Sequence, residues 1–248
     1  MPRLILCGLA AVLLIVISLP ITLVQAICGM FNPALKDSIV FHYARFCLRV
    51  MEFCAGVEVT VLGEENIPWD EPVLFVGNHR SGFDIILTYA RMKKPVAYIA
   101  KKELQNIPYI SYWMKLIHVL FLDREDLRQG MQVIMQAIDL IKGGVNVFIY
   151  PEGTRNKGDD DQDLLEFREG SFRVASRTGC KIIPVAITGS VNIFEAHFPK
   201  IYKTRVVLEY GEPIDPTTLT KDEQRHLGIA TRMMIGQMIH KNKAVLVG

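Results

Sequence analysis

The sequence predicts an α/β fold, a mixed central sheet flanked by helices, preceded by an apolar helical hairpin or span that anchors the chain in a membrane. From residue 57 onward, short runs rich in β-branched residues alternate with longer windows of helical periodicity. Several of these runs are apolar without alternation, as strands are when helices cover both faces of a sheet. We therefore predict an anchor with an amphipathic helix at 1–56 and a single main domain at 57–248.

The expected anchor has no charged residue over 4–35. A straight helix of that length would exceed the hydrocarbon core of a bilayer, which is about 30 Å thick. We expect Pro20 to break the segment and Asn32 and Pro33 to close it, so that two short apolar pieces dip into one leaflet as a hairpin. A single tilted span is the alternative, and a cleaved secretory signal, suggested by the small residues at 24–26, is another. For the span, the basic residues after the segment place the main domain in the cytosol. The hairpin also leaves the main domain facing the cytosol, at the inner membrane in a bacterium.

The segment 36–55 has apolar positions at three- and four-residue spacing with charges between them. This pattern predicts an amphipathic helix that either packs on the core or lies along a membrane surface. The strands expected after it are 57–62, 73–77, 96–100, 118–122, 145–150, 181–187 and 205–210. The helices expected are 85–92, 109–116, 126–142, 170–178 and 221–241. The acidic run 158–163 lacks the ligand spacing of a calcium loop and is expected to be a solvated turn.

Composition argues against several classes of function. A formal charge of +2 does not indicate a polyanion-binding surface, so nucleic acid is not expected as a partner. The five cysteines are irregularly spaced and form no CxxC pair, which argues against both a disulfide framework and a zinc site. We expect reduced thiols.

The first chemical motif is the stretch Asn-His-Arg-Ser-Gly-Phe-Asp at 78–84, between a predicted strand and a predicted helix. Gly82 allows a turn tight enough for Asp84 to accept a hydrogen bond from one ring nitrogen of His79. The other nitrogen can then act as a base near neutral pH. Because this pair has no protein nucleophile, the hydroxyl that it activates would belong to a substrate. Taken alone, the pair is also compatible with a capping aspartate and a structural histidine.

The second motif, Phe-Ile-Tyr-Pro-Glu-Gly-Thr-Arg at 148–155, again joins a predicted strand to a loop. Gly153 permits close approach of the backbone to an anion, and Thr154 offers a hydroxyl. Arg155 offers a planar guanidinium that suits phosphate oxygens. Glu152 would repel a phosphate, so we expect it to position neighbouring groups through a hydroxyl or a backbone N–H.

Together these motifs resemble the glycerolipid acyltransferases, the family of the 1-acylglycerol-3-phosphate acyltransferases. The four blocks of that family occur here in order, at 79–84, 119–124, 151–155 and 182–187, and the similarity extends through 101–108 and 167–170. Two departures from the pattern are Tyr150, where phenylalanine is usual, and Asn156 with the acidic run, where a shorter turn is common. We expect neither departure to touch a catalytic atom.

The resemblance implies that 57–248 is an acyltransferase catalytic domain acting in phospholipid biosynthesis. The enzyme would move a fatty acyl group from acyl-coenzyme A or an acyl carrier protein to the sn-2 hydroxyl of 1-acylglycerol-3-phosphate (lysophosphatidic acid), giving phosphatidic acid at a membrane bilayer. His79 would be the general base and Asp84 its orienter. The acceptor-binding residues would be Arg124, Glu152, Gly153, Thr154 and Arg155, with Lys101 and Lys102 adding positive potential. Neither a metal nor a bound cofactor is implied.

Other interpretations stay open at this point. The acceptor could be glycerol-3-phosphate or another lysolipid, and water in its place would make the enzyme a thioester hydrolase. A non-catalytic lipid-binding module is a third possibility. Without the family resemblance, Arg124 would be assigned to a surface salt bridge, and the pair Lys101 and Lys102 to a solvated face.

Overall fold

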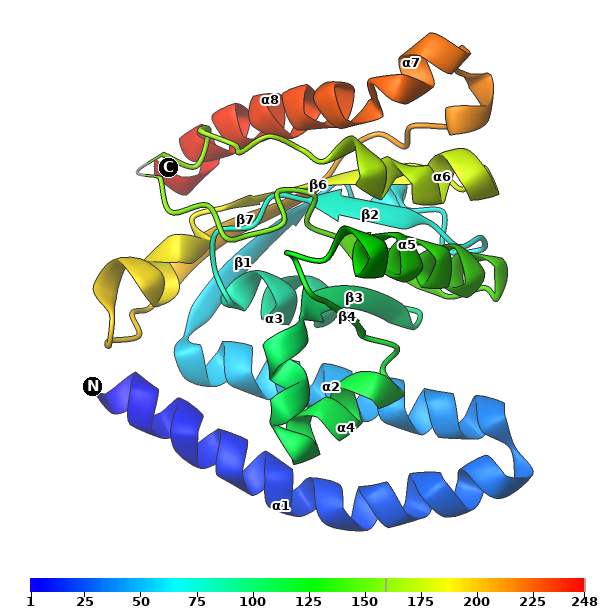
Figure 1. Cartoon of the computed structure of the whole chain (residues 1–248). Coiled ribbons are helices and arrows are strands. Elements are labelled where there is room, and N and C mark those ends of the chain that lie inside the picture. The colour runs from blue at the N-terminus through cyan, green and yellow to red at the C-terminus, as the bar shows by residue number, and fades with distance from the viewer. Residues whose placement is uncertain (159, 248) are drawn as a thin grey trace. The chain divides into compact units, whose positions relative to one another are not determined.

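The strands of the chain form one seven-stranded sheet (Figure 1). The structure is a computed structural model that describes residues 1–158 and 160–247, so Asp159 of the acidic run lies outside the described residues. The strand order is β1 (Val57–Leu62), β7 (Thr204–Tyr210), β6 (Ile182–Thr188), β2 (Leu74–Gly77), β5 (Asn146–Ile149), β3 (Val96–Lys101) and β4 (Leu120–Leu122). The predicted mixed sheet is confirmed. The pairs β2–β5, β2–β6, β3–β5 and β3–β4 are parallel, and β6–β7 is antiparallel.

The chain divides into two compact units, each made of three segments. The first comprises Met1–Val59, Ser81–Pro95 and Gly189–Val206, and the second comprises Thr60–Arg80, Val96–Thr188 and Val207–Gly248. The predicted division between residues 56 and 57 stays a prediction.

The core of the second unit follows from the two-residue period of its strands. On β2, Leu74 and Val76 face a cluster of aliphatic side chains supplied by α5 (Leu127–Lys142), α6 (Arg173–Thr178) and α8 (Leu227–Val247). The residue between them, Phe75, joins an aromatic layer: its ring stacks on Phe148 of β5 at 5.8 Å, and Phe148 stacks on Tyr98 at 5.0 Å. Both faces of these strands are therefore buried, as their unbroken apolar pattern predicts.

The helix predicted at 221–241 is in fact two helices, α7 (Lys221–Arg225) and α8, which meet at His226. Thr220 starts α7 with a capping box that it shares with Glu223. The carboxylate of Glu169 accepts hydrogen bonds from the backbone N–H groups of Gly228 and Ile229, at 2.9 and 3.2 Å. Because Glu169 satisfies the first N–H groups of α8, interrupting the helix at His226 costs little free energy.

The apolar segment of the first unit is one helix, α1 (Pro2–Phe31), so the expectation that Pro20 breaks it is wrong. Hydroxyls on either side of the proline bond to the main chain, Ser18 to the carbonyl of Ile15 at 2.6 Å and Thr22 to that of Ser18 at 2.8 Å. Such side-chain bonds, with a packed neighbouring helix, make proline tolerable inside an apolar helix. Among the described residues, α1 is the helix long and apolar enough to cross a membrane.

A hairpin nevertheless exists, with α1 and α2 (Pro33–Ala55) as its arms. The turn is Asn32, whose side chain caps α2 by accepting a hydrogen bond from the Leu35 N–H at 3.1 Å. Farther along, the Tyr43 hydroxyl donates to the carbonyl of Leu14. At the open end, the guanidinium of Arg3 lies against Gly56, which terminates α2 at φ +71°. The two helices are thus antiparallel along their whole length.

Charged side chains of α2 bond to protein groups, and the choice between core and membrane surface for its apolar stripe stays a prediction. Arg45 and Arg49 each donate from Nε to the carbonyl of Ala90, at 3.0 and 3.1 Å, just after α3 (Phe83–Tyr89). Glu52 accepts two hydrogen bonds from Arg91, both at 2.8 Å.

Candidate active site

The two chemical motifs leave adjacent parallel strands at the same edge of the sheet. In the β2–β5 ladder, Val76 is paired with Ile149. His79 and Glu152 each follow three residues later, so they emerge side by side at the carboxyl ends of the strands. This is where open α/β sheets place their functional loops.

Glu152 fixes the backbone at His79. Its Oε1 accepts a hydrogen bond from the His79 N–H at 2.8 Å, and its Oε2 accepts one from the Leu165 N–H at 3.1 Å. The side chain is buried, with 4% of its surface exposed. We expected Glu152 to position neighbouring groups, and it does so by accepting hydrogen bonds from two backbone N–H groups.

The imidazole of His79 lies on the ring of Tyr150, with centroids 4.3 Å apart and planes inclined by 22°. The backbone N–H of Asn156 donates to the His79 carbonyl at 2.7 Å. The Tyr150 ring therefore does contact the imidazole of the proposed base, against the expectation for this departure, whereas Asn156 bonds only the main-chain carbonyl of His79. The Asn156 contact is a main-chain bond open to any residue but proline, whereas the Tyr150 contact depends on the aromatic side chain.

Asn78 is a positioning residue to which the sequence reasoning assigned no role. Its amide bridges to the end of β6, donating to the Ile187 carbonyl at 2.9 Å and accepting from the Ile187 N–H at 2.8 Å. With only 1% of its surface exposed, it locks the residue before His79 to the strand next to β2.

Asp84 belongs to the first compact unit. It is fully buried in the first turn of α3, where Oδ2 accepts a hydrogen bond from the Ser81 N–H at 2.8 Å and Oδ1 accepts one from the Ser190 hydroxyl at 2.6 Å. The carboxylate therefore does lie in the tight turn expected at 81–84. The hydrogen bond between Asp84 and His79 stays a prediction.

Three guanidinium groups gather in the second unit around the loop after β5. A Cβ added to Gly153, at φ +71°, would lie 2.9 Å from Nε of Arg168, so that side chain rests against the motif backbone. Burial lowers the pKa of Arg124, and the positive charges of Arg168 and Arg155 lower it further against the opposing effect of Glu103. Arg168 was not among the predicted site residues, although it lies in the similar stretch 167–170.

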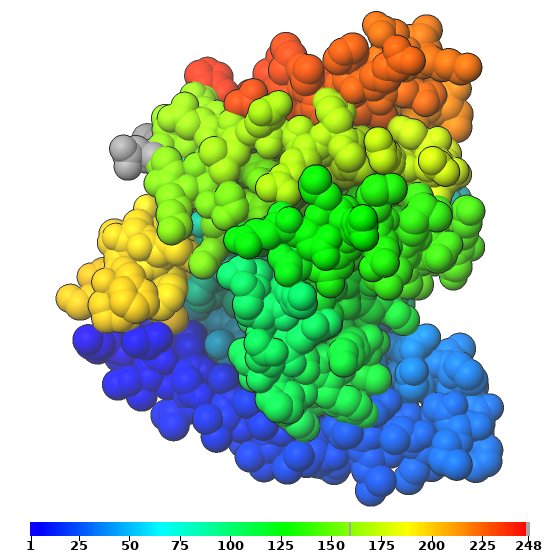
Figure 2. Space-filling view, in the orientation of Figure 1, coloured from blue at the N-terminus to red at the C-terminus, as the bar shows by residue number. Residues whose placement is uncertain are grey.

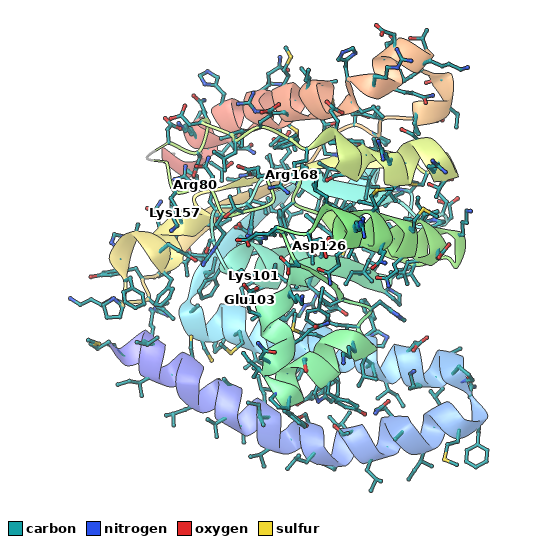
Figure 3. The ribbon with its side chains drawn as sticks, viewed as in Figure 1. Arg80, Lys101, Glu103, Asp126, Lys157 and Arg168 are labelled. Atoms are coloured by element: carbon teal, nitrogen blue, oxygen red, sulfur yellow. The ribbon has the colours of Figure 1, made fainter. Side chains whose placement is uncertain are left out.

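The two predicted lysines have acidic neighbours. Lys101, at the end of β3, pairs with Glu103 at 2.6 Å (Figure 3), and Lys102 pairs with Asp123 at 3.2 Å. Both ion pairs are exposed, and such pairs contribute little and exchange partners readily. Thr154 and Arg155 are exposed as well.

The acidic run is more than the expected solvated turn. Asp161 pairs at 3.1 Å with Arg80, which has 4% of its surface exposed and also donates to the Gly158 carbonyl. Asp160 pairs with Lys243 of α8. The run thus supplies the counter-charge for the buried arginine that follows His79. Within the described residues no group of three or more His, Cys, Asp or Glu side chains is arranged to hold a metal ion.

Comparison with known proteins identifies the class to which this fold and site belong. Residues 58–188 match the family described as Acyltransferase, and the chain belongs to that family. It is accordingly an acyltransferase, as the resemblance implied. A 1-acyl-sn-glycerol-3-phosphate acyltransferase of Borreliella burgdorferi is 28% identical over 207 residues, 84% of this chain and 80% of that protein.

Two further similar proteins are also acyltransferases by name. A 1-acyl-sn-glycerol-3-phosphate acyltransferase of Saccharomyces cerevisiae is 26% identical over 181 residues, which are 73% of this chain and 59% of the yeast protein. The crystal structure of the 1-acyl-sn-glycerophosphate (LPA) acyltransferase PlsC from Thermotoga maritima superimposes with a TM-score of 0.80 at 27% identity, covering 98% of this chain and 95% of that one. The similarity thus includes the N-terminal helices as well as the sheet.

The stacking contact leads to a first prediction. Replacing Tyr150 by leucine removes an aromatic contact of about 0.5–1.5 kcal/mol, so we expect kcat for acyl transfer to fall by about 2- to 12-fold. Tyr150→Phe keeps the ring and should stay close to the wild-type rate in the same steady-state assay. Equal losses in both variants would show that the hydroxyl, not the stacked ring, is what matters.

Proposed function

We propose that this enzyme transfers a fatty acyl group from acyl-coenzyme A or an acyl carrier protein to the sn-2 hydroxyl of 1-acylglycerol-3-phosphate, yielding phosphatidic acid. The observation that carries the proposal is the hydrogen bond from the His79 backbone N–H to the Glu152 carboxylate. It joins the segment of the proposed base to the loop that bears the proposed anion-binding residues. The names of the relatives point to the same acceptor.

In the proposed reaction, His79 takes the proton of the acceptor hydroxyl as its oxygen attacks the thioester carbonyl carbon. A C–O bond forms, the tetrahedral intermediate collapses, and the C–S bond breaks with departure of the thiolate, which then takes up the proton. Asp84 orients the imidazole and stabilises its protonated form. A thiol has an ordinary pKa near 8.5, so the leaving group needs neither a dedicated acid nor a metal or resident cofactor.

The phosphate of the acceptor would bind at the guanidinium groups of Arg124, Arg155 and Arg168. Like charges held close together repel, and a dianion between them relieves that repulsion while accepting several charge-assisted hydrogen bonds. Lys101 and Lys102 would add positive potential by leaving their exposed carboxylate partners.

Membrane attachment would come from α1. Most of its large apolar side chains are exposed, and the residues buried are Cys7, Leu14, Ser18 and Gln25. Figure 2 shows this helix as the deep blue segment on the surface. Because α2 lies antiparallel against α1 and carries charges bonded to α3, we propose that the hairpin inserts into one leaflet rather than crossing the bilayer, with the catalytic residues on the cytosolic side.

The activity test compares wild type, His79→Ala and His240→Ala in detergent with labelled acyl donor, with and without lysophosphatidic acid. We expect phosphatidic acid only when the acceptor is present, a loss of about 10²- to 10⁴-fold in His79→Ala, and little change in His240→Ala, which removes an exposed histidine. Free fatty acid formed without acceptor would instead identify a thioester hydrolase. No turnover by wild type with either donor would contradict the proposal.

A pair of glycines tests the phosphate site. Gly153 and Gly144 both have positive φ, +71° and +86°, but a Cβ on Gly144 would meet nothing within 4 Å. Alanine at either position costs about 1–2 kcal/mol of backbone strain, whereas only Gly153→Ala displaces Arg168. We expect the KM for the phosphate-bearing acceptor to rise about tenfold in Gly153→Ala alone, the loss of roughly one charge-assisted hydrogen bond. Equal KM values in the two variants would exclude Arg168 from acceptor binding.

A further inference from the structure

The segment after β6 supplies two polar side chains that lie outside all four sequence blocks. Ser190 begins a short 3-10 helix, Ser190–Ile193, and Glu195 begins the next, Glu195–His197. Both belong to the first compact unit, together with the turn 81–84. They reach that turn across 106 and 114 residues of sequence.

Ser190 fixes one oxygen of Asp84. Its hydroxyl donates to Oδ1 at 2.6 Å, while the Ser81 N–H donates to Oδ2 at 2.8 Å. With a donor on each oxygen, the carboxylate cannot rotate without losing a bond. Ser190 has 2% of its surface exposed and Asp84 has none, so water cannot readily replace a lost donor.

Glu195 holds the turn that carries Asp84. Its Oε2 accepts a hydrogen bond from the Ser81 hydroxyl at 2.6 Å, and its Oε1 accepts one from the Gly82 N–H at 2.8 Å. The Ser81 hydroxyl oxygen in turn accepts a bond from the Phe83 N–H at 3.0 Å. One carboxylate therefore fixes, directly or through Ser81, the two main-chain N–H groups that precede Asp84.

We infer that Ser190 and Glu195 are positioning residues for acyl transfer, which hold the carboxylate and the turn of Asp84, the residue proposed to orient His79. This inference rests on the proposed function, because its effect is exerted through the general base. A displacement of about 1 Å in a catalytic group can cost about 10²-fold in rate. The loss of either side chain should therefore lower kcat and leave substrate binding unchanged.

The test measures kcat and both KM values for Ser190→Ala, Ser190→Thr and Glu195→Gln. Ser190→Ala should lower kcat about 10- to 100-fold with KM values within about twofold of wild type, and Ser190→Thr, which keeps the hydroxyl, should recover most of the rate. Glu195→Gln keeps one acceptor oxygen and should give a smaller loss. The matched control is Thr231→Val, which removes a fully buried hydroxyl bonded to the Leu227 carbonyl in α8.

The double variant Ser190→Ala/His79→Ala distinguishes a positioning role of Ser190 from a general structural defect. If Ser190 acts through His79, Ser190→Ala should cause no further loss in the His79→Ala background, whereas an independent structural defect would multiply the two losses. The inference is overturned if Ser190→Ala keeps wild-type kcat, if the losses multiply, or if Ser190→Thr fails to recover activity. Absence of acyl transfer by wild type would instead contradict the proposed function, so the two failures are distinguishable.

Discussion

The parallel pairing of β2 with β5 is the constraint on which the site depends. The register of Val76 on Ile149 brings both motif loops to one sheet edge, and the buried carboxylate of Glu152 joins them through the His79 N–H. A buried carboxylate must be paired, and here both of its oxygens accept main-chain hydrogen bonds. The hydrogen bond from the His79 N–H to Glu152 thus fixes the backbone at the proposed base. Its loss would leave the buried Glu152 carboxylate with one hydrogen-bond donor fewer.

In the second unit, the acidic and basic groups of the proposed site have different tasks: the carboxylate of Glu152 positions the backbone, and the arginines are the groups proposed to bind phosphate. Glu152, the acidic residue of its motif, is occupied with backbone donors, so its charge is largely compensated before any substrate arrives. The guanidinium of Arg168 lies against Gly153, and it contributes to the depressed pKa of Arg124. Closely spaced cations of this kind are costly in the empty enzyme and favourable once a phosphate dianion lies among them. In the proposed enzyme, this arrangement would favour acceptors that carry phosphate over neutral alcohols.

The sequence predicted the sheet class, most of the strands and the motif loops, because these depend on local patterns and on short spacings such as that between His79 and Asp84. The sequence did not predict features that depend on contacts between residues far apart in the chain. Ser190 and Glu195 reach the turn from more than a hundred positions away, and no local pattern marks them. The Tyr150 stack depends on the relative placement of two strand ends. Pro20 would break an isolated helix, but in α1 the antiparallel α2 and nearby hydroxyls sustain it.

The first unit suggests how membrane attachment and the orienting carboxylate are connected. Arg45 and Arg49 both bond the Ala90 carbonyl, at the negative end of the α3 dipole, and Glu52 pairs with Arg91 just beyond. Arg45, Arg49 and Glu52 of α2 are therefore directed at the end of α3, whose first turn carries Asp84. The other arm, α1, carries no charge beyond Arg3 and exposes most of its large apolar side chains. A helix held by directional bonds at its carboxyl end cannot shift along α2 without breaking them. The hairpin thus fixes the helix that carries Asp84, the residue proposed to orient the base.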